Sequence, residues 1–400
     1  MVSQKSVCGV VGAMALVIGG AAQVAAQTSF KVGEKEVQVH GFVQQGFVAS
    51  SGNNFLTLQS EDGSGAMTDG GVNVSTKLHE KVRVGMQLYA RNVGQFGNGH
   101  PEVDWAYVDY SAKPWLGVRA GKVKTSLGLI NDTQDMEFLH TWALLPQAVY
   151  PLDLRSVMIA HTGADVYGRL NTKKAGSLAY TAYGGVMPDD KRGGYRYGLE
   201  DIGLQVPGDI TRAGGGYDLR WSLPIEGAQF GFSHFMSSGE MNFISASAPI
   251  PLHLDLTTWD AQSLYGDYQK DNWHFSGEWR RQYIELKITP QIGPPTAPID
   301  NRSWFLSGAY RVAKPVEIGA YYSRFVANTA LDASLDSNHI SGPALTARFD
   351  VLRYMSVKVE GHFMDGYGDP AQPHGFYLRN NTTGFKEHTN MLVVRTAFAF

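Results

Sequence analysis

The sequence predicts an all-β protein, namely a sixteen-stranded antiparallel transmembrane β-barrel with short turns at one end and long loops at the other. Three observations lead to this prediction. After residue 27, apolar and polar side chains alternate in runs of about ten residues, as expected for strands that cross a membrane. The connections between these runs alternate between long and short. The chain also ends on such a run, "NMLVVRTAFAF", with an aromatic residue in last place.

Residues 1–26 are expected to be a secretory signal peptide, which leaves residues 27–400 as the barrel domain. Lys5 precedes an apolar run that ends in small residues up to Ala26, as a cleavage site requires. A membrane anchor is the alternative, but it needs roughly 20 apolar residues, and this run is shorter and rich in glycine. The single cysteine, Cys8, lies in this segment, so the mature chain can form no disulfide.

Period-two alternation defines the sixteen strands. They are predicted at residues 37–49, 71–79, 81–91, 103–112, 115–125, 161–172, 177–187, 214–222, 227–238, 257–269, 272–285, 302–312, 315–325, 342–352, 355–365 and 387–400. Aromatic residues stand near the ends of the apolar faces, as in "WFLSGAYRV" and "WHFSGEW", which is the position of an interfacial girdle.

The connections sort into two kinds. The long ones are residues 50–70, 92–102, 126–160, 188–213, 239–256, 286–301, 326–341 and 366–386. The short ones carry turn residues, as in "AKPW", "TKKAG" and "QKDN". Both termini then lie on the short-turn side, so the short turns are expected to be periplasmic and the long loops extracellular. A secreted sandwich or propeller is the alternative, but it would not sort every second connection by length.

Alternation also assigns side chains to lipid or to the lumen. Arginine on the lipid face at the bilayer midplane costs roughly 2–4 kcal/mol, so Arg395 must point inward while Leu392 and Phe398 face lipid. The same argument places other charged side chains inward: Lys77, Arg83, Arg91, Arg119, Arg169, Arg220, Arg280, Arg311, Arg348, Asp350, Lys358, Glu360 and His362. Such a charged lining requires water, so the barrel should enclose an aqueous channel.

The third long connection differs from the others. Residues 127–160 lack the strand alternation but include the apolar stretch "WALLPQAVYPL", which would not remain in solvent. Long loops without regular structure are commonly functional. We therefore expect this loop to fold into the lumen as a constriction, with Asp132, Asp135 and Glu137 toward the pore. The alternative is a loop that packs over the barrel mouth or against a neighbouring subunit.

With these features, the chain resembles the trimeric porins of Gram-negative outer membranes. The resemblance rests on the strand count, the third loop and the last strand "LVVRTAFAF" with its terminal Phe400. It implies a homotrimer in contact with outer-membrane lipid and lipopolysaccharide, and recognition of Phe400 by the barrel-assembly machinery. The Pro-Glu-Phe-Gly type of motif found in many general porins is replaced by "NDTQDMEF", so the subfamily stays open.

The resemblance also implies a basic wall opposite the acidic third loop. The side chains expected to form it are Lys77, Arg83, Arg348, Lys358 and Arg395. Further lumen candidates are Arg119, Arg280 and Glu360. For any one of these residues the alternative is a structural salt bridge inside the barrel, for instance between Arg348 and Glu360.

The predicted function is a water-filled channel for passive diffusion of ions and small hydrophilic solutes across the outer membrane. The net charge of -3 does not favour nucleic-acid binding. The sequence shows no nucleophile–base constellation and no metal-ligand spacing, so we expect no catalytic residue, no cofactor and no enzyme. A receptor or structural barrel is the main alternative. An outer-membrane hydrolase is a weaker one, because "DSNH" at Asp336 lies in a predicted loop.

Overall fold

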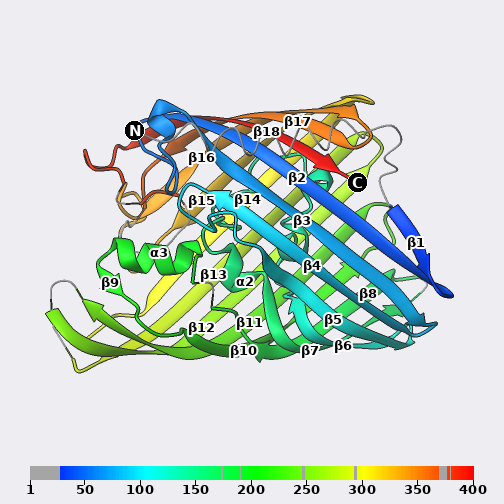
Figure 1. Ribbon diagram of the computed structural model, residues 1–400. Coiled ribbons are helices and arrows are strands. Elements are labelled where there is room, and N and C mark those ends of the chain that lie inside the picture. Colours follow the sequence, from blue (N-terminus) through cyan, green and yellow to red (C-terminus); the bar gives the residue numbers. More distant parts are fainter. Residues whose placement is uncertain are drawn as a thin grey trace.

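A sixteen-stranded antiparallel barrel is formed by the described residues of the computed structural model (Figure 1). The described residues are 28–172, 174–189, 191–245, 248–291, 295–368, 376–378 and 380–400. The barrel closes where β18 (His388–Ala399) pairs with β2 (Lys35–Ser51), and β8 (Ser177–Val186) pairs with β10 (Thr211–Ser222). The predicted fold class is confirmed. The predicted signal peptide, residues 1–26, lies outside the described residues and stays a prediction.

The other barrel strands follow one another around the wall. They are β3 (Ser64–His79), β4 (Val82–Val93), β5 (Glu102–Lys113), β6 (Leu116–Lys124), β7 (Ala160–Asn171), β11 (Ala228–Ser245), β12 (Ala248–Lys270), β13 (Trp273–Thr289), β14 (Ile299–Ala313), β15 (Val316–Val326), β16 (His339–Leu352) and β17 (Met355–Asp365). Each corresponds to one predicted run, because alternation of apolar and polar residues is what a wall between lipid and lumen imposes.

Short elements accompany the barrel. Two strands lie outside the ring: β1 (Thr28–Val32) pairs with β2, and β9 (Leu204–Gln205) pairs with β11. The helical turns are η1 (Ser60–Asp62), η2 (Asn131–Thr133), η3 (Glu137–Leu139), α2 (Arg155–Met158) and α3 (Gly194–Asp201). No helix in the described part of the chain is long and apolar enough to cross a membrane.

The prediction of a long connection at residues 239–256 is wrong. In its place β11 and β12 continue as a long antiparallel hairpin, in which Met241 pairs with Leu254 and Phe243 pairs with Leu252. Met241, Phe243 and Leu252 are buried with Leu199 of α3 in one apolar cluster. Packing against α3 therefore extends these two strands beyond the predicted membrane span.

The two faces of the wall follow the predicted alternation. Leu392 is exposed on the outside, whereas Met391 and Val393 on the same strand are buried inside. An aromatic group also lies on the outer face, where Trp304 pairs with Trp279 and stacks on Tyr322 at a ring distance of 5.6 Å. These are the positions that an interfacial girdle occupies.

The last residue closes the barrel seam. The backbone of Phe400 accepts a hydrogen bond from Gly41 at 2.9 Å and donates one to it at 2.8 Å. The Phe400 ring also lies over Gly41, where a Cβ atom would come within 2.2 Å of it. Any side chain at this position would displace the Phe400 ring, so Gly41 leaves the space in which the terminal aromatic packs against β2.

The main apolar core lies inside the barrel, between the loops and the inner face of the wall. It joins three long loops: Leu56 of the first loop forms a bridge with Tyr377 of the last, and both are buried together with Leu144 and Val149 of the third loop. Burial of apolar side chains at about 25 cal/mol per Å² is the dominant force that holds such loops against one another. The loops therefore pack as one body inside the ring of strands.

Candidate constriction site in the barrel lumen

The third loop, residues 125–159 between β6 and β7, crosses the lumen. On one side Gly128 donates its backbone N–H to Ser233 on β11 at 2.6 Å, and Leu129 donates to Glu278 on β13 at 2.9 Å. On the opposite side the loop contacts Lys358 on β17. The infolding predicted from the apolar composition of this loop is confirmed, because its buried side chains join the core inside the barrel.

Three basic side chains of the wall meet the loop in a row. Arg348, Lys358 and Arg395 stand in register on β16, β17 and β18. Lys358 Nζ lies 2.7 Å from Glu137 Oε1, and Arg395 Nη1 lies 3.3 Å from Glu137 Oε2. We call these three residues the basic ladder. Two of its members, Lys358 and Arg395, contact Glu137 directly rather than across open space.

The basic ladder also binds the loop backbone. Arg348 donates to the carbonyl of His140 at 2.9 Å, and Arg395 donates to that of Ala143 at 3.1 Å. Lys358 donates to the carbonyls of residues 137 and 142, each at 2.9 Å. The ladder therefore holds the backbone of residues 137–143 in place, and two of its members also pair with the Glu137 carboxylate.

The ionisation of the loop follows from its surroundings. Burial alone would raise the pKa of Glu137, but Arg395 and Lys358 bring this pKa below its usual value. Burial lowers the pKa of His140 to about 4, so its imidazole is neutral at pH 7. Glu137 is thus a carboxylate, and His140 adds no charge beside it.

Asp135 meets a different part of the wall. Its carboxylate forms an ion pair with Lys124 and accepts a hydrogen bond from Gln87 Nε2 at 2.5 Å. Burial raises the pKa of Asp135, but the positive charges of Lys124 and Arg155 outweigh burial and leave this pKa lowered. Asp135 is therefore ionised where the loop passes β4 and β6.

Asp132 meets a third part of the wall. Its carboxylate lies 3.6 Å from Nη2 of Arg220 on β10, and a third of its side chain stays exposed. Arg220 also binds Asp218 at 2.7 Å. The structure thus places each of the three predicted acids beside a basic side chain, but in three separate sectors rather than one cluster.

Two members of the predicted basic wall lie elsewhere. Lys77 and Arg83 pair with each other beside the turn between β3 and β4, and both are exposed. Arg83 donates to Ser75 at 2.8 Å. The structure does not bring them to the third loop, because they lie at the short-turn end of their strands while the loop crosses at the level of Asp69, which Arg395 contacts at 2.5 Å.

The remaining lumen candidates have local partners. Arg119 lies 4.2 Å above the Tyr167 ring, and buried Arg280 pairs with Glu278 at 2.8 Å. Glu360 accepts hydrogen bonds from the backbone N–H groups of residues 143 and 144 at 3.0 Å each. The suggested pair of Arg348 with Glu360 does not form, since Arg348 binds Asp350 at 2.8 Å. The pore roles of all these residues stay predictions.

Some residues of the site escaped sequence reasoning. Asp69 fell within a predicted loop because β3 begins earlier than the alternation indicated. Arg155 is buried and binds Asp104 at 3.1 Å, and its guanidinium lies 4.2 Å above the Tyr89 ring. A polar cavity of about 80 Å³ adjoins this group. Arg155 follows the apolar part of the third loop, so only the path of the folded loop brings it to β5.

A closed sixteen-stranded barrel with an apolar outer face and a charged lumen defines a Gram-negative outer-membrane barrel with a porin-like fold. No protein-family model matches the sequence. No curated protein matches it at a significant level. The similarity to known proteins therefore lies in the fold.

Solved structures cover almost the whole chain. OmpT of Vibrio cholerae has a TM-score of 0.58 at 11% identity, over 93% of this chain and 100% of that chain. The anion-selective porin from Comamonas acidovorans has a TM-score of 0.54 at 13% identity, over 92% and 100%. Salmonella typhi OmpF, in a complex with daunomycin, has a TM-score of 0.56 at 9% identity, over 93% and 100%.

These comparisons correct one sequence-based expectation. We expected that the chain is not an enzyme because no nucleophile–base constellation was found. The structural neighbours include the OmpT barrels as well as porins, and at 10% to 11% identity the likeness shows the fold alone. The lack of a recognisable nucleophile–base pair is not sufficient to exclude catalysis in this fold. The expectation that the chain is not an enzyme was therefore wrong.

Proposed function

We propose that the protein is an outer-membrane porin, a water-filled channel for passive diffusion of ions and small hydrophilic solutes. The observation that carries the proposal is the exposure of cationic side chains that face inward. Lys77, Arg83 and Arg169 lie on the lumen face of their strands and are nevertheless exposed. Charged groups on that face are exposed only where water enters, which supports a wet vestibule at the short-turn end.

The third loop is the proposed constriction. It crosses the barrel where Glu137 meets the basic ladder, while Asp135 meets Lys124 on another part of the wall. Fixed charges of both signs at a narrow passage tune ion preference and favour polar solutes over apolar ones. The contacts of the loop with several wall strands support a narrow channel rather than a wide one.

Purified protein is expected to form ion-conducting channels in planar lipid bilayers, because the inward charges require water. Discrete current steps would be measured, with protein-free detergent as the control. A current that never rises above the lipid baseline would contradict the porin proposal. It would favour the second candidate, a structural or receptor barrel. The apolar packing of Leu56, Leu144 and Tyr377 between the loops supports this second candidate.

We also propose a homotrimer that contacts outer-membrane lipid and lipopolysaccharide, and that Phe400 is read by the barrel-assembly machinery. At the barrel seam, Val43 of β2 pairs in register with Phe398 of β18 and adds apolar side chains to the outer face. Beside it, β3 to β6 carry an outer concavity of about 540 Å³, floored by small residues such as Ala120. OmpT of Vibrio cholerae has been solved in a trimer form. Symmetric association through such an outer face supports the proposal.

Ala120→Trp is expected to convert the trimer to a monomer, because a bulky ring would fill the concavity that a neighbour should occupy. The mass of the protein in mild detergent, by native mass spectrometry, reports the change. Ala320→Trp is the matched control, since Ala320 is exposed on β15, outside the concavity. A wild-type monomer, or a trimer that survives Ala120→Trp, would rule out this interface.

A further inference from the structure

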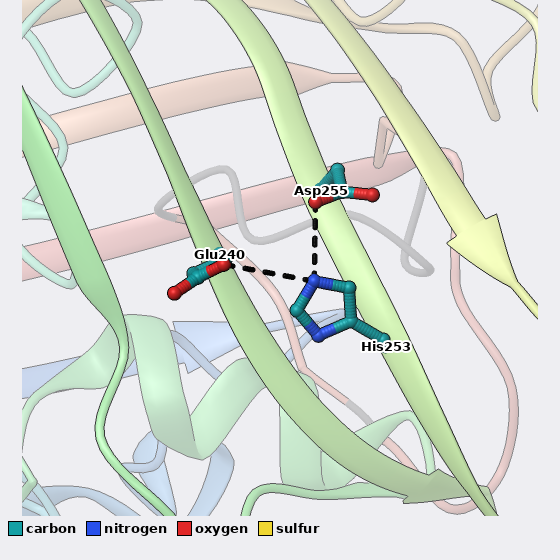
Figure 2. Close-up of side chains that lie close together, drawn as sticks. All are labelled: Glu240, His253 and Asp255. Atoms are coloured by element: carbon teal, nitrogen blue, oxygen red, sulfur yellow. Dashed lines mark hydrogen bonds and ion pairs between the residues drawn. The ribbon is translucent and has the colours of Figure 1, made fainter.

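A cluster of metal-ligating side chains lies on the outer face of the long hairpin of β11 and β12. Glu240 pairs in register with Asp255, and Asn242 pairs with His253, so all four side chains share one face. The opposite face is buried, as Met241 shows. Figure 2 shows Glu240 and Asp255 converging on His253 from the two strands. The cluster takes no part in the proposed constriction.

A single nitrogen of His253 faces both carboxylates. Nε2 lies 3.1 Å from Asp255 Oδ1 and 3.7 Å from Glu240 Oε2 (Figure 2). The other nitrogen, Nδ1, lies 2.9 Å from the amide oxygen of Asn242. An amide oxygen only accepts hydrogen bonds, so Nδ1 carries a proton and donates it there. Nε2 is also within hydrogen-bond distance of Asp255 Oδ1. In the neutral imidazole its lone pair would face two anionic oxygens, an arrangement that a shared cation stabilises.

We propose that Glu240, His253 and Asp255 bind a divalent transition metal of the Zn²⁺ type. Their three ligand atoms lie within 4.8 Å of one another. One imidazole nitrogen and two carboxylate oxygens suit Zn²⁺ and its neighbours, whereas Ca²⁺ and Mg²⁺ take oxygen ligands alone. Asn242 acts as the positioning residue, because a hydrogen bond to the second nitrogen fixes the tautomer and the ring orientation. The half-exposed site leaves a coordination position open to water.

A second cluster, at the ends of β17 and β18, provides the contrast. There the two carboxylates meet different nitrogens of one imidazole: Asp365 lies 3.1 Å from His388 Nδ1, and Glu387 lies 3.5 Å from His388 Nε2. The three ligand atoms of this cluster also lie within 4.8 Å of one another, but its two carboxylates approach different nitrogens, whereas at His253 both approach Nε2. This second cluster therefore serves as the matched control.

The experiment uses the full-length folded protein in detergent after treatment with a chelator, with Zn²⁺ titrated by calorimetry. A single Zn²⁺ per chain is expected, lost in His253→Ala and retained in His388→Ala. Asn242→Ala should weaken binding by about 10–100-fold, as removal of an outer-shell partner does. Unchanged binding in Asn242→Ala would overturn the positioning role of that residue.

A spectroscopic readout separates this site from nonspecific binding. With Cu²⁺ as the probe, electron paramagnetic resonance should show coupling to one imidazole nitrogen in the wild type and in His388→Ala, and none in His253→Ala. Far-UV circular dichroism of all variants reports that they are folded. Absence of Zn²⁺ binding by the wild type, or equal binding by His253→Ala, would overturn the metal site while leaving the porin proposal untouched.

Discussion

Replacing Glu360 with alanine is expected to release the tip of the third loop and raise the single-channel conductance. The Glu360 carboxylate is fully buried and accepts the backbone N–H groups of Ala143 and Leu144 at 3.0 Å each, together with the hydroxyl of Thr346. Hydrogen bonds to a charged group contribute about 1.5–3 kcal/mol each. Loss of the two backbone contacts alone should weaken docking of the loop by about 3–6 kcal/mol, because both donors are left unpaired.

The variant series tests whether the loop limits the current. Glu360→Gln keeps one acceptor oxygen, so its conductance should lie between those of the wild type and Glu360→Ala. Asp109→Asn is the matched control, since Asp109 is a wall carboxylate whose partners, Arg119 and Tyr167, lie on β6 and β7 rather than on the third loop. A conductance in Glu360→Ala equal to that of the wild type would mean that the docked loop does not narrow the path.

The barrel wall could be predicted because its physics is local. A strand between lipid and lumen must alternate, so Leu392 and Arg395 could be assigned to opposite faces from the sequence alone. The extension of the β11 and β12 hairpin was not predicted, because beyond the membrane span the pattern of side chains is no longer set by lipid on one face and the lumen on the other. There Phe243 is buried in one apolar cluster with Leu199 of α3, and the sequence does not show that this helix packs against the extended hairpin.

The contacts of the third loop depend on where its backbone lies, and only part of them could be predicted. Its acidic character and its infolding follow from composition. The partners of Glu360 could not be predicted from composition, because they are backbone N–H groups, which every residue except proline carries. The separation of Asp132 and Asp135 into different sectors also escaped prediction, since residues three apart diverge once η2 turns the chain. Arg348, Lys358 and Arg395 do meet the loop, because adjacent strands keep inward residues in register.

Neutralising the acids of the third loop is expected to shift ion preference toward anions. Glu137→Gln removes the charge opposite Lys358 and Arg395, and the triple variant with Asp132→Asn and Asp135→Asn removes all three. A unit charge about 8 Å from a permeating ion is worth about 2 kcal/mol at an effective dielectric constant of about 20. Half of that would change the anion-to-cation permeability ratio about fivefold, which reversal potentials under a salt gradient measure directly.

The pH dependence of the reversal potential provides a control for the effect of the acid substitutions. The pKa values of Glu137 and Asp135 are lowered in the folded protein, so the unfolded chain binds the extra protons as the solution becomes acidic. The stabilisation of the loop by these carboxylates is thus present at neutral pH and is lost only as the pH falls through the lowered, folded-state pKa values. The part of the wild-type reversal potential that Glu137 and Asp135 set should therefore persist through the ordinary titration range of carboxylates and be lost only below it. Reversal potentials that are identical in the wild type and the triple variant at neutral pH would place the acids outside the ion path, and the constriction proposed for the third loop would fall with them.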